Sequence, residues 1–139
     1  MQPTDAFHEL SYYTLAHPDR EKFLHQHVID AFTAQNAGPD TKPIGLLYAL
    51  AGLYLAVEQG YSGREVQRAH MELAKDKTDF PPLTLPSDRG ALTVADVLAI
   101  PAGAARDMLI LEWCAAVWDA YAESQSVIAG YCKKRQLCP

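Results

Sequence analysis

Apolar residues recur every three to four positions along most of this chain, which is the spacing of helices with one buried face. No stretch alternates between apolar and polar residues in the way that a half-buried strand would. The pattern predicts an all-α protein: a compact bundle of four main helices with a short accessory helix and a proline-rich loop over residues 78–92. Helical segments are expected at residues 4–16, 18–36, 43–59, directly after Ser62, and at 94–100 and 104–131.

Two of the predicted helices begin at sequence signals for an N-terminal cap. Ser62 is followed three residues later by Glu65, and Thr93 is followed by Asp96. In a capping box of this kind each side chain bonds the backbone N–H of the other residue, which satisfies donors that the first helical turn leaves free. Pro43 suits the first turn of the third predicted helix because proline lacks an N–H.

The third predicted helix, residues 43–59, is apolar on all sides. Gly45, Ala49, Gly52 and Ala56 form a stripe of small residues along it, which would let another helix approach closely. A helix that is hydrophobic all round is normally buried all round. A bundle of 139 residues does not easily wrap one helix completely, so we predict a homodimer formed through this helix.

Length and composition limit the kind of protein that this can be. The chain has 139 residues, 49% of them hydrophobic, which suits a single helical domain over residues 1–139. Twelve Lys and Arg against seventeen Asp and Glu give a net charge of −5, which argues against a nucleic-acid partner. No apolar run is as long as a membrane span and no signal peptide is evident, so we expect a cytoplasmic protein with no membrane partner.

The three cysteines do not form a metal-binding pattern. Cys114 lies in the apolar stripe of a predicted helix, and no Cys-x-x-Cys pair occurs. Cys132 and Cys138 lie near the end of the chain, where a local disulfide is an open alternative to two free thiols. We expect reduced thiols, in agreement with a cytoplasmic location.

Four of the five histidines fall within the first 27 residues, and such clustering raises the question of a metal. His25 and His27 point about 160° apart on one regular helix, so a single ion cannot bind both. His8 and His17 likewise fall on opposite faces of a regular helix. We therefore expect no metal and no cofactor, and keep a site built from His8, His17 and His27 as the alternative.

The strongest candidates for catalysis are His27 and Asp30, three residues apart on the second predicted helix. His27 falls on the apolar face of that helix, and Asp30 lies on the border of that face, within reach of it. An imidazole beside a carboxylate has a fixed tautomer and can transfer protons near neutral pH. The structural alternative is a buried pair that only satisfies its own hydrogen bonds.

A second candidate site lies on the helix after Ser62. Arg64 and Arg68 share one face near the helix N-terminus, where the helix dipole disfavours cations, and His70 follows them. An anion would resolve that mismatch, so these residues form a candidate pocket for a small anionic ligand. The alternative is an ion pair within the chain.

The segment from His25 to Gln35, which reads HQHVIDAFTAQ, resembles a bacterial family known only as a domain of unknown function. The resemblance extends to about Ala74. It implies His25, Asp30 and Gln35 as the polar positions of interest, and a bacterial, cytoplasmic setting. Of these, we take His25 and Gln35 as candidate ligand-binding residues. Some relatives carry N-terminal cysteine pairs that suggest a metal; this chain has none, so the resemblance implies no zinc site here.

Two functions follow from these observations. The interpretation that we favour is a non-enzymatic binding or interaction module with a pocket for a small anionic ligand. The alternative is a metal-binding or hydrolytic enzyme with a His/Asp site on the second helix. An enzyme should place His27 and Asp30 in a solvent-connected cavity beside another titratable group, whereas a module should have both packed and satisfied.

Overall fold

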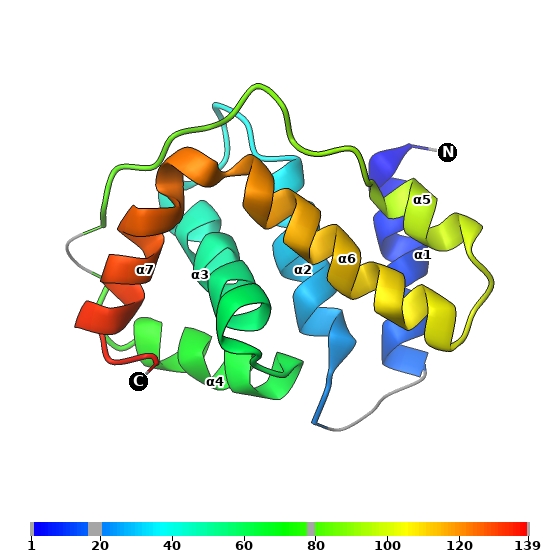
Figure 1. Ribbon diagram of the computed structural model, residues 1–139, viewed down its shortest axis with the longest axis horizontal. Coiled ribbons are helices and arrows are strands. Elements are labelled where there is room, and N and C mark those ends of the chain that lie inside the picture. The colour runs from blue at the N-terminus through cyan, green and yellow to red at the C-terminus, as the bar shows by residue number, and fades with distance from the viewer. Residues whose placement is uncertain (1, 17–20, 78–79, 139) are drawn as a thin grey trace.

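Two helices, α2 (Leu24–Gln35) and α3 (Pro43–Gln59), lie at the centre of the molecule and contact most of the others (Figure 1). The computed structural model describes residues 2–16, 21–77 and 80–138. These ranges contain helices, turns and loops but no strand, so the predicted all-α class is confirmed. Along the same ranges no helix is long and apolar enough to cross a membrane. The other α-helices are α1 (Pro3–Ala16), α4 (Gly63–Leu73), α5 (Val94–Ala99), α6 (Ala104–Ala120) and α7 (Gln125–Lys134).

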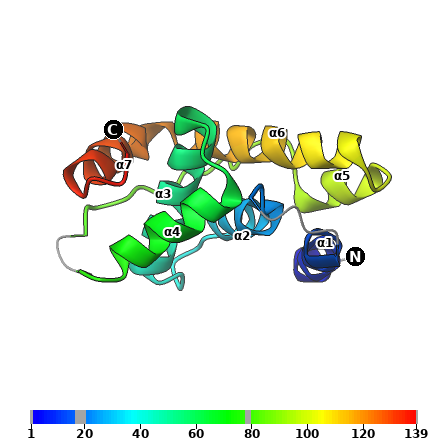
Figure 2. The same ribbon diagram turned by 90° about the horizontal axis from the view of Figure 1, so that it is seen from below.

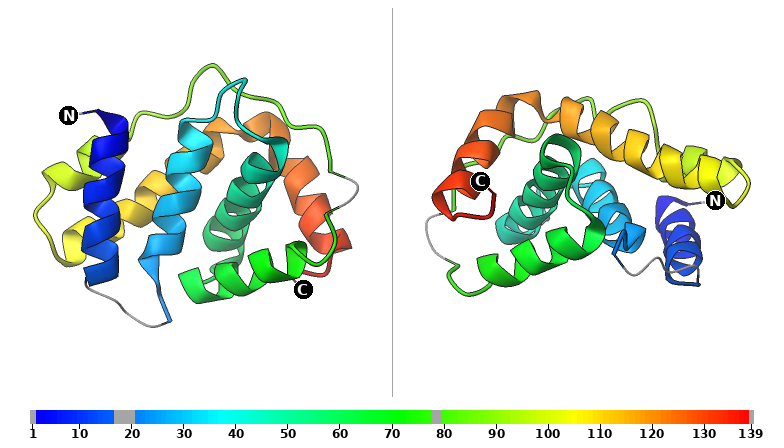
Figure 3. Two further views of the ribbon diagram at one scale, coloured as in Figure 1. Left: turned by 180° about the vertical axis from the view of Figure 1, so that it is seen from behind. Right: turned by 60° about the horizontal axis from the view of Figure 1, so that its bottom comes forward.

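The helices form two layers. α1, α2 and α3 lie side by side in one layer, and α6 runs obliquely across α2 on one side of it and also contacts α3 (Figure 1 and Figure 3). α5 packs against α1 and α6 at one end, α7 packs against α3 at the other, and α4 lies across one end of α2 and α3 (Figure 2). The described part of the predicted proline-rich loop, residues 80–92, contains no helix and leads along the molecule to α5.

α3 is buried on almost every side, as its composition predicted, but within one chain. Leu47, Leu50 and Leu53 are at most 1% exposed, and α2, α4, α6 and α7 all contact the helix. The reason given for a homodimer through residues 43–59 is therefore wrong, because a single chain does wrap this helix. Burial of α3 within one chain favours a monomer over a dimer formed through this helix.

Gly52 on α3 faces the Asp30 side chain of α2. A Cβ atom at this position would lie 2.0 Å from Oδ2 of Asp30 and 3.2 Å from Nε2 of His70. Gly45, in the same predicted stripe of small residues, has no atom within 4 Å of the equivalent point. The missing side chain of Gly52 therefore leaves the space that the Asp30 carboxyl group occupies.

The prediction of a single last helix over residues 104–131 is wrong. α6 ends at Ala120, and a short 3-10 helix over Ala122–Ser124 leads into α7. At the break the Tyr121 hydroxyl donates to the carbonyl of Ala34 at 2.6 Å. This bond holds the break against the end of α2, and α7 then packs against α3.

The second helix was predicted over residues 18–36, of which 18–20 lie outside the described residues; within the described part it begins later than predicted. α2 starts at Leu24, and Phe23 before it has a left-handed backbone with φ of 40°. The segment before α2 crosses the N-terminus of α4, where the N–H of Gly63 donates to the carbonyl of Lys22 at 2.6 Å. A Cβ at Gly63 would lie 1.9 Å from the carbonyl oxygen of Phe23, so this crossing requires glycine at the start of α4.

Both predicted capping boxes are confirmed. At the start of α4 the N–H of Glu65 donates to the Ser62 hydroxyl at 3.2 Å, and the N–H of Ser62 donates to the Glu65 carboxylate at 3.0 Å. Thr93 and Asp96 make the same reciprocal bonds at the start of α5. These local signals place Glu65 in the first turn of α4, where it also lines the site described next.

Candidate functional site

A cleft opens where α2, α4 and α6 begin and where α3 ends. Its volume is about 490 Å³, in the range of pockets that hold small molecules. Leu24 from α2, Ala56 from α3, and Met108 and Leu111 from α6 form an apolar wall. Met108 is 64% exposed, so part of this wall faces water.

Of the described residues, four Lys, His, Asp or Glu side chains line the same cleft: Lys22, His27, Glu65 and Asp107. Lys22 is exposed, whereas Glu65 and Asp107 are partly buried. The capping box of α4 fixes Glu65, and Asp107 in the first turn of α6 accepts a hydrogen bond from the Tyr13 hydroxyl at 2.6 Å. The cleft therefore combines an apolar wall with a few oriented polar groups, as ligand sites commonly do.

His27 is the most buried of these four side chains, with 3% of its surface exposed. Its Nδ1 atom is buried without a partner, and no group in the described part of the chain hydrogen-bonds its ring. Burial lowers the pKa of His27 to about 4, so the imidazole is neutral at neutral pH. An unpaired buried polar group costs stability, and no hydrogen bond of the fold accounts for a histidine here.

Three other polar side chains form a hydrogen-bonded chain between α2, α3 and α4. The amide of Gln26 donates to Oδ1 of Asp30 at 3.2 Å, and its nitrogen lies 3.4 Å from Nδ1 of His70. Nε2 of His70 lies 2.7 Å from the carbonyl oxygen of Tyr48. Because a carbonyl only accepts, His70 donates its Nε2–H to Tyr48 and presents Nδ1 to Gln26. The two amide hydrogens of Gln26 thus serve Asp30 and His70, and the tautomer of His70 is fixed.

Asp30 belongs to this network and does not line the cleft. It is 2% exposed, and its Oδ2 atom is buried without a partner against Gly52. Burial raises the pKa of Asp30 well above its usual value, which favours the neutral carboxyl group. No hydrogen bond joins it to His27 among the described residues, so the predicted pair is not formed.

Gln26 is the member of this network that the sequence analysis missed. Its spacing of four residues from Asp30 was an available signal, because side chains at i and i+4 are neighbours on a helix. The link from Gln26 to His70 spans 44 positions and gives no such signal.

His25 and Gln35, the other positions implied by the resemblance, are used within the fold. Nδ1 of His25 lies 3.2 Å from the hydroxyl oxygen of Thr14, which joins α1 to α2. The Gln35 amide donates to the carbonyl of Arg89 at 3.2 Å and its oxygen accepts from the Trp113 indole at 2.9 Å. Gln35 therefore ties the proline-rich loop to α6, and neither side chain lines the cleft.

The structure does not bring Arg64, Arg68 and His70 together. The Arg64 guanidinium lies 3.7 Å from the centre of the Phe23 ring. Arg68 pairs with Glu21 at 3.1 Å, and both of these side chains are mostly exposed. His70 is held by its bonds to α2 and α3. The charge mismatch at the start of α4 is therefore met by an ion pair within the chain.

Among the described residues, no group of three His, Cys, Asp or Glu side chains could hold a metal ion. Of the alternative metal ligands, His8 is exposed on α1 and His27 is buried in the cleft wall. His17 lies outside the described residues.

Cys114 is a buried core residue, as the sequence suggested. Its Sγ lies 3.6 Å from the carbonyl oxygen of His27, and burial raises the pKa of the thiol. Such a thiol is a poor nucleophile. Cys132 and Cys138 are both free thiols in the structure.

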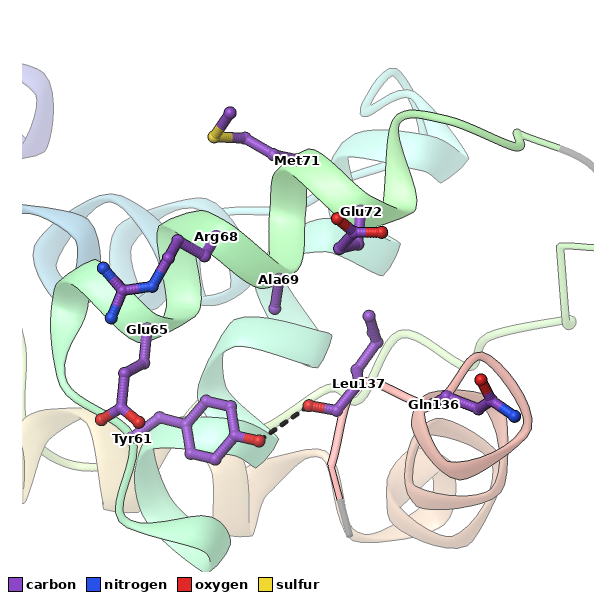
Figure 4. A pocket seen from close by; sticks show the side chains of 8 residues that line it. All are labelled: Tyr61, Glu65, Arg68, Ala69, Met71, Glu72, Gln136 and Leu137. Atoms are coloured by element: carbon purple, nitrogen blue, oxygen red, sulfur yellow. Dashed lines mark hydrogen bonds between the residues drawn. The ribbon is translucent and has the colours of Figure 1, made fainter.

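A second hollow, of about 360 Å³, lies between α4 and the C-terminal segment (Figure 4). Tyr61 and Glu65 line both this hollow and the cleft, and the Tyr61 hydroxyl donates to the carbonyl of Leu137 at 2.8 Å. A larger hollow of about 540 Å³ lies between the proline-rich loop and α6 and is lined mainly by small and exposed acidic residues. Neither contains a buried histidine, so the cleft at His27 is the stronger candidate.

The fold and the cleft define a small all-helical protein with a buried, neutral histidine in the wall of an apolar pocket. By sequence the chain belongs to the family of unknown function DUF5946, which matches residues 4–122. The match includes every residue that lines the cleft and ends before α7. The predicted relationship to an uncharacterised family is thereby confirmed. No curated protein and no solved structure matches the chain.

Proposed function

We propose that this protein is a non-enzymatic binding module, and that a small molecule with an apolar body enters the cleft and hydrogen-bonds to His27. The observation that carries the proposal is the buried imidazole, which lines a cleft and has no hydrogen bond to its ring within the described part of the chain. Buried groups of this kind with a perturbed pKa are concentrated at functional sites. Nδ1 is closed off from solvent, so a bound ligand would bond the other ring nitrogen, Nε2.

The other functions suggested by the sequence have less support. The anionic pocket relied on Arg64, Arg68 and His70, and each of these is engaged elsewhere. The enzyme relied on His27 acting with Asp30, and Asp30 lies outside the cleft. A module was expected to have both side chains packed and satisfied. Both are buried, but Nδ1 of His27 and Oδ2 of Asp30 have no partner among the described residues, so this expectation is met only in part.

We further propose that residues 1–139 act as one domain in the bacterial cytoplasm. One cluster of buried residues includes side chains from all seven α-helices described, which supports a single folding unit. The family resemblance supports the bacterial setting, and the three free thiols agree with a reducing compartment.

Phenethyl alcohol, a neutral probe with an apolar ring and one hydroxyl group, tests the binding proposal. In an NMR titration we expect a dissociation constant on the order of 1 mM, which is reasonable for a ligand of this size. The ring nitrogens of His27 and the backbone amides of Leu24 and Met108 should shift with one binding curve. His27→Leu should weaken binding about fivefold, the equivalent of one hydrogen bond.

His25→Leu is the matched control, because it is the same substitution on the same helix outside the cleft. It should leave the affinity for phenethyl alcohol unchanged. Equal affinity in the His27→Leu variant, or shifts that never reach His27, would show that the cleft does not bind in the proposed way.

A further inference from the structure

We propose that the ligand of the cleft is an organic cation, a protonated amine carried on an apolar body. This inference rests on the proposed binding function and adds the charge of the ligand to it. It reverses the charge of the ligand expected from the sequence.

Two carboxylates from different helices line the cleft, Glu65 from α4 and Asp107 from α6. One oxygen of each is held by the protein: Oε1 of Glu65 accepts from the N–H of Ser62, and Oδ1 of Asp107 accepts from the Tyr13 hydroxyl. The second oxygen of each has no donor among the described residues. The protein therefore orients both carboxylates through one oxygen and, within its described part, supplies no donor to the other.

The remaining polar groups of the cleft agree with a cationic ligand. Among the described lining residues Lys22 is the single ammonium group, and it is exposed, so the carboxylates outnumber it. His27 is neutral and adds a hydrogen-bonding group without adding a competing positive charge. Charge-assisted hydrogen bonds from an ammonium group to carboxylates are stronger than those between neutral groups.

The arrangement suits an extended organic molecule better than a metal ion. No three ligating side chains of the described residues are grouped closely enough for a metal, which argues against one ion bound jointly by His27 and the carboxylates. Met108 and Leu111 are 64% and 48% exposed, and an apolar body lying on them would remove that surface from water. Methionine also adapts its shape to different ligands.

Three probes of similar shape and different charge test the inference: phenethylamine, phenethyl alcohol and 3-phenylpropionate, titrated by NMR at pH 7 and low salt. We expect the amine to bind about fivefold more tightly than the alcohol, the upper end for partly exposed charge pairs, and the carboxylate to bind most weakly. Added salt should weaken binding of the amine and leave binding of the alcohol unchanged, because salt screens the interaction between charges.

Glu65→Gln and Asp107→Asn identify the groups responsible. Both substitutions keep the oxygen that accepts from Ser62 or Tyr13, so the local structure is preserved. Each should bring the affinity for the amine closer to the affinity for the alcohol. Glu112→Gln makes the same charge change at an exposed position of α6 outside the cleft. It should alter the affinity for neither the amine nor the alcohol.

The outcomes separate this inference from the binding proposal. If the alcohol binds at His27 and the amine binds no more tightly, or the carboxylate binds best, the charge inference is overturned and the binding module stands. If the amine is preferred and neither carboxylate variant alters that preference, the assignment to Glu65 and Asp107 is overturned. If none of the three probes shifts the His27 signals, both proposals fall.

Discussion

Two buried titratable residues on α2 should make stability depend on pH in opposite directions. Burial lowers the pKa of His27 to about 4, so the unfolded chain takes up a proton before the native protein does. Stability is therefore lost as the pH falls from about 6.5 towards 4. Burial raises the pKa of Asp30 above its ordinary value of 3.8, so the native protein keeps this proton longer, and stability is lost as the pH rises above that value.

His27→Leu should be nearly neutral for stability at pH 7 and stabilising in acid. No described residue depends on the ring for a hydrogen bond, so the free energy of unfolding at pH 7 should change by less than about 1 kcal/mol. At pH 5 the variant should be more stable than the parent by about 2 kcal/mol, because it lacks the proton uptake of the unfolded histidine. Urea unfolding at the two pH values measures both quantities.

His25 and His70 also have pKa values lowered mainly by burial, but they titrate in both proteins and so cancel in the comparison. A loss of 2 kcal/mol or more at pH 7 would mean that the fold uses the His27 ring, and would remove the observation on which the binding proposal depends.

The sequence predicted which residues of α2 are buried better than it predicted their partners. Helical spacing placed His27 on the apolar face, and it is buried there. The same spacing allowed a bond between His27 and Asp30, whereas the carboxyl group bonds Gln26 one turn earlier. The position of the Asp30 carboxyl group depends on two residues of other helices. Gly52 of α3 leaves space for it, and His70 of α4 bonds the same Gln26 amide. Local spacing along one helix cannot predict contacts between residues that are far apart in the sequence.

Among elements, the contact between α2 and α3 can be tested with two identical substitutions on one helix. Gly52→Ala should destabilise the protein by about 1–3 kcal/mol, because the added Cβ would overlap the Asp30 carboxyl group, which is buried. Gly45→Ala meets no atom within 4 Å and should stabilise it by about 0.5–1 kcal/mol, because alanine favours the helix over glycine. Chemical unfolding of both variants gives the comparison.

Equal effects of the two substitutions would show that Asp30 moves away without cost and that Gly52 is not required by the packing. A double variant, Gly52→Ala with Asp30→Ala, checks the stated cause. It should recover part of the loss, because shortening Asp30 removes the overlapping atoms.

Element boundaries that depend on local chemistry were predictable, and those set by distant contacts were not. Both capping boxes lie where Ser62 and Thr93 indicated, because a cap is made by residues three positions apart. The end of α6 coincides with a bond from Tyr121 to Ala34, 87 positions away, while the apolar stripe continues through the break. The late start of α2 likewise accompanies the crossing over α4.

For the whole molecule, the position of α3 decides what can be expected of its assembly. The sequence showed that this helix must be covered, but not by what. The structure covers it with α2, α4, α6 and α7 of the same chain, an arrangement that a single helix pattern cannot specify. The apolar surface that would have driven a dimer through α3 is therefore already buried, and its burial contributes to the stability of one chain.

We accordingly expect the protein to have the mass of one chain, 15.3 kDa, in sedimentation equilibrium at micromolar concentration. The large apolar side chains that remain exposed include Tyr12 on α1, Met71 on α4 and Met108 on α6. None of them belongs to α3. A measured mass of two chains would show that the protein is a homodimer, as predicted from the sequence, but one formed through an exposed side chain of another helix and not through α3. Met71→Lys and Met108→Lys would then show which surface forms the dimer. Met71→Lys should disrupt a dimer formed at α4, and Met108→Lys should disrupt one formed at the cleft, because a charge placed in an apolar contact disrupts only the interface that contains it.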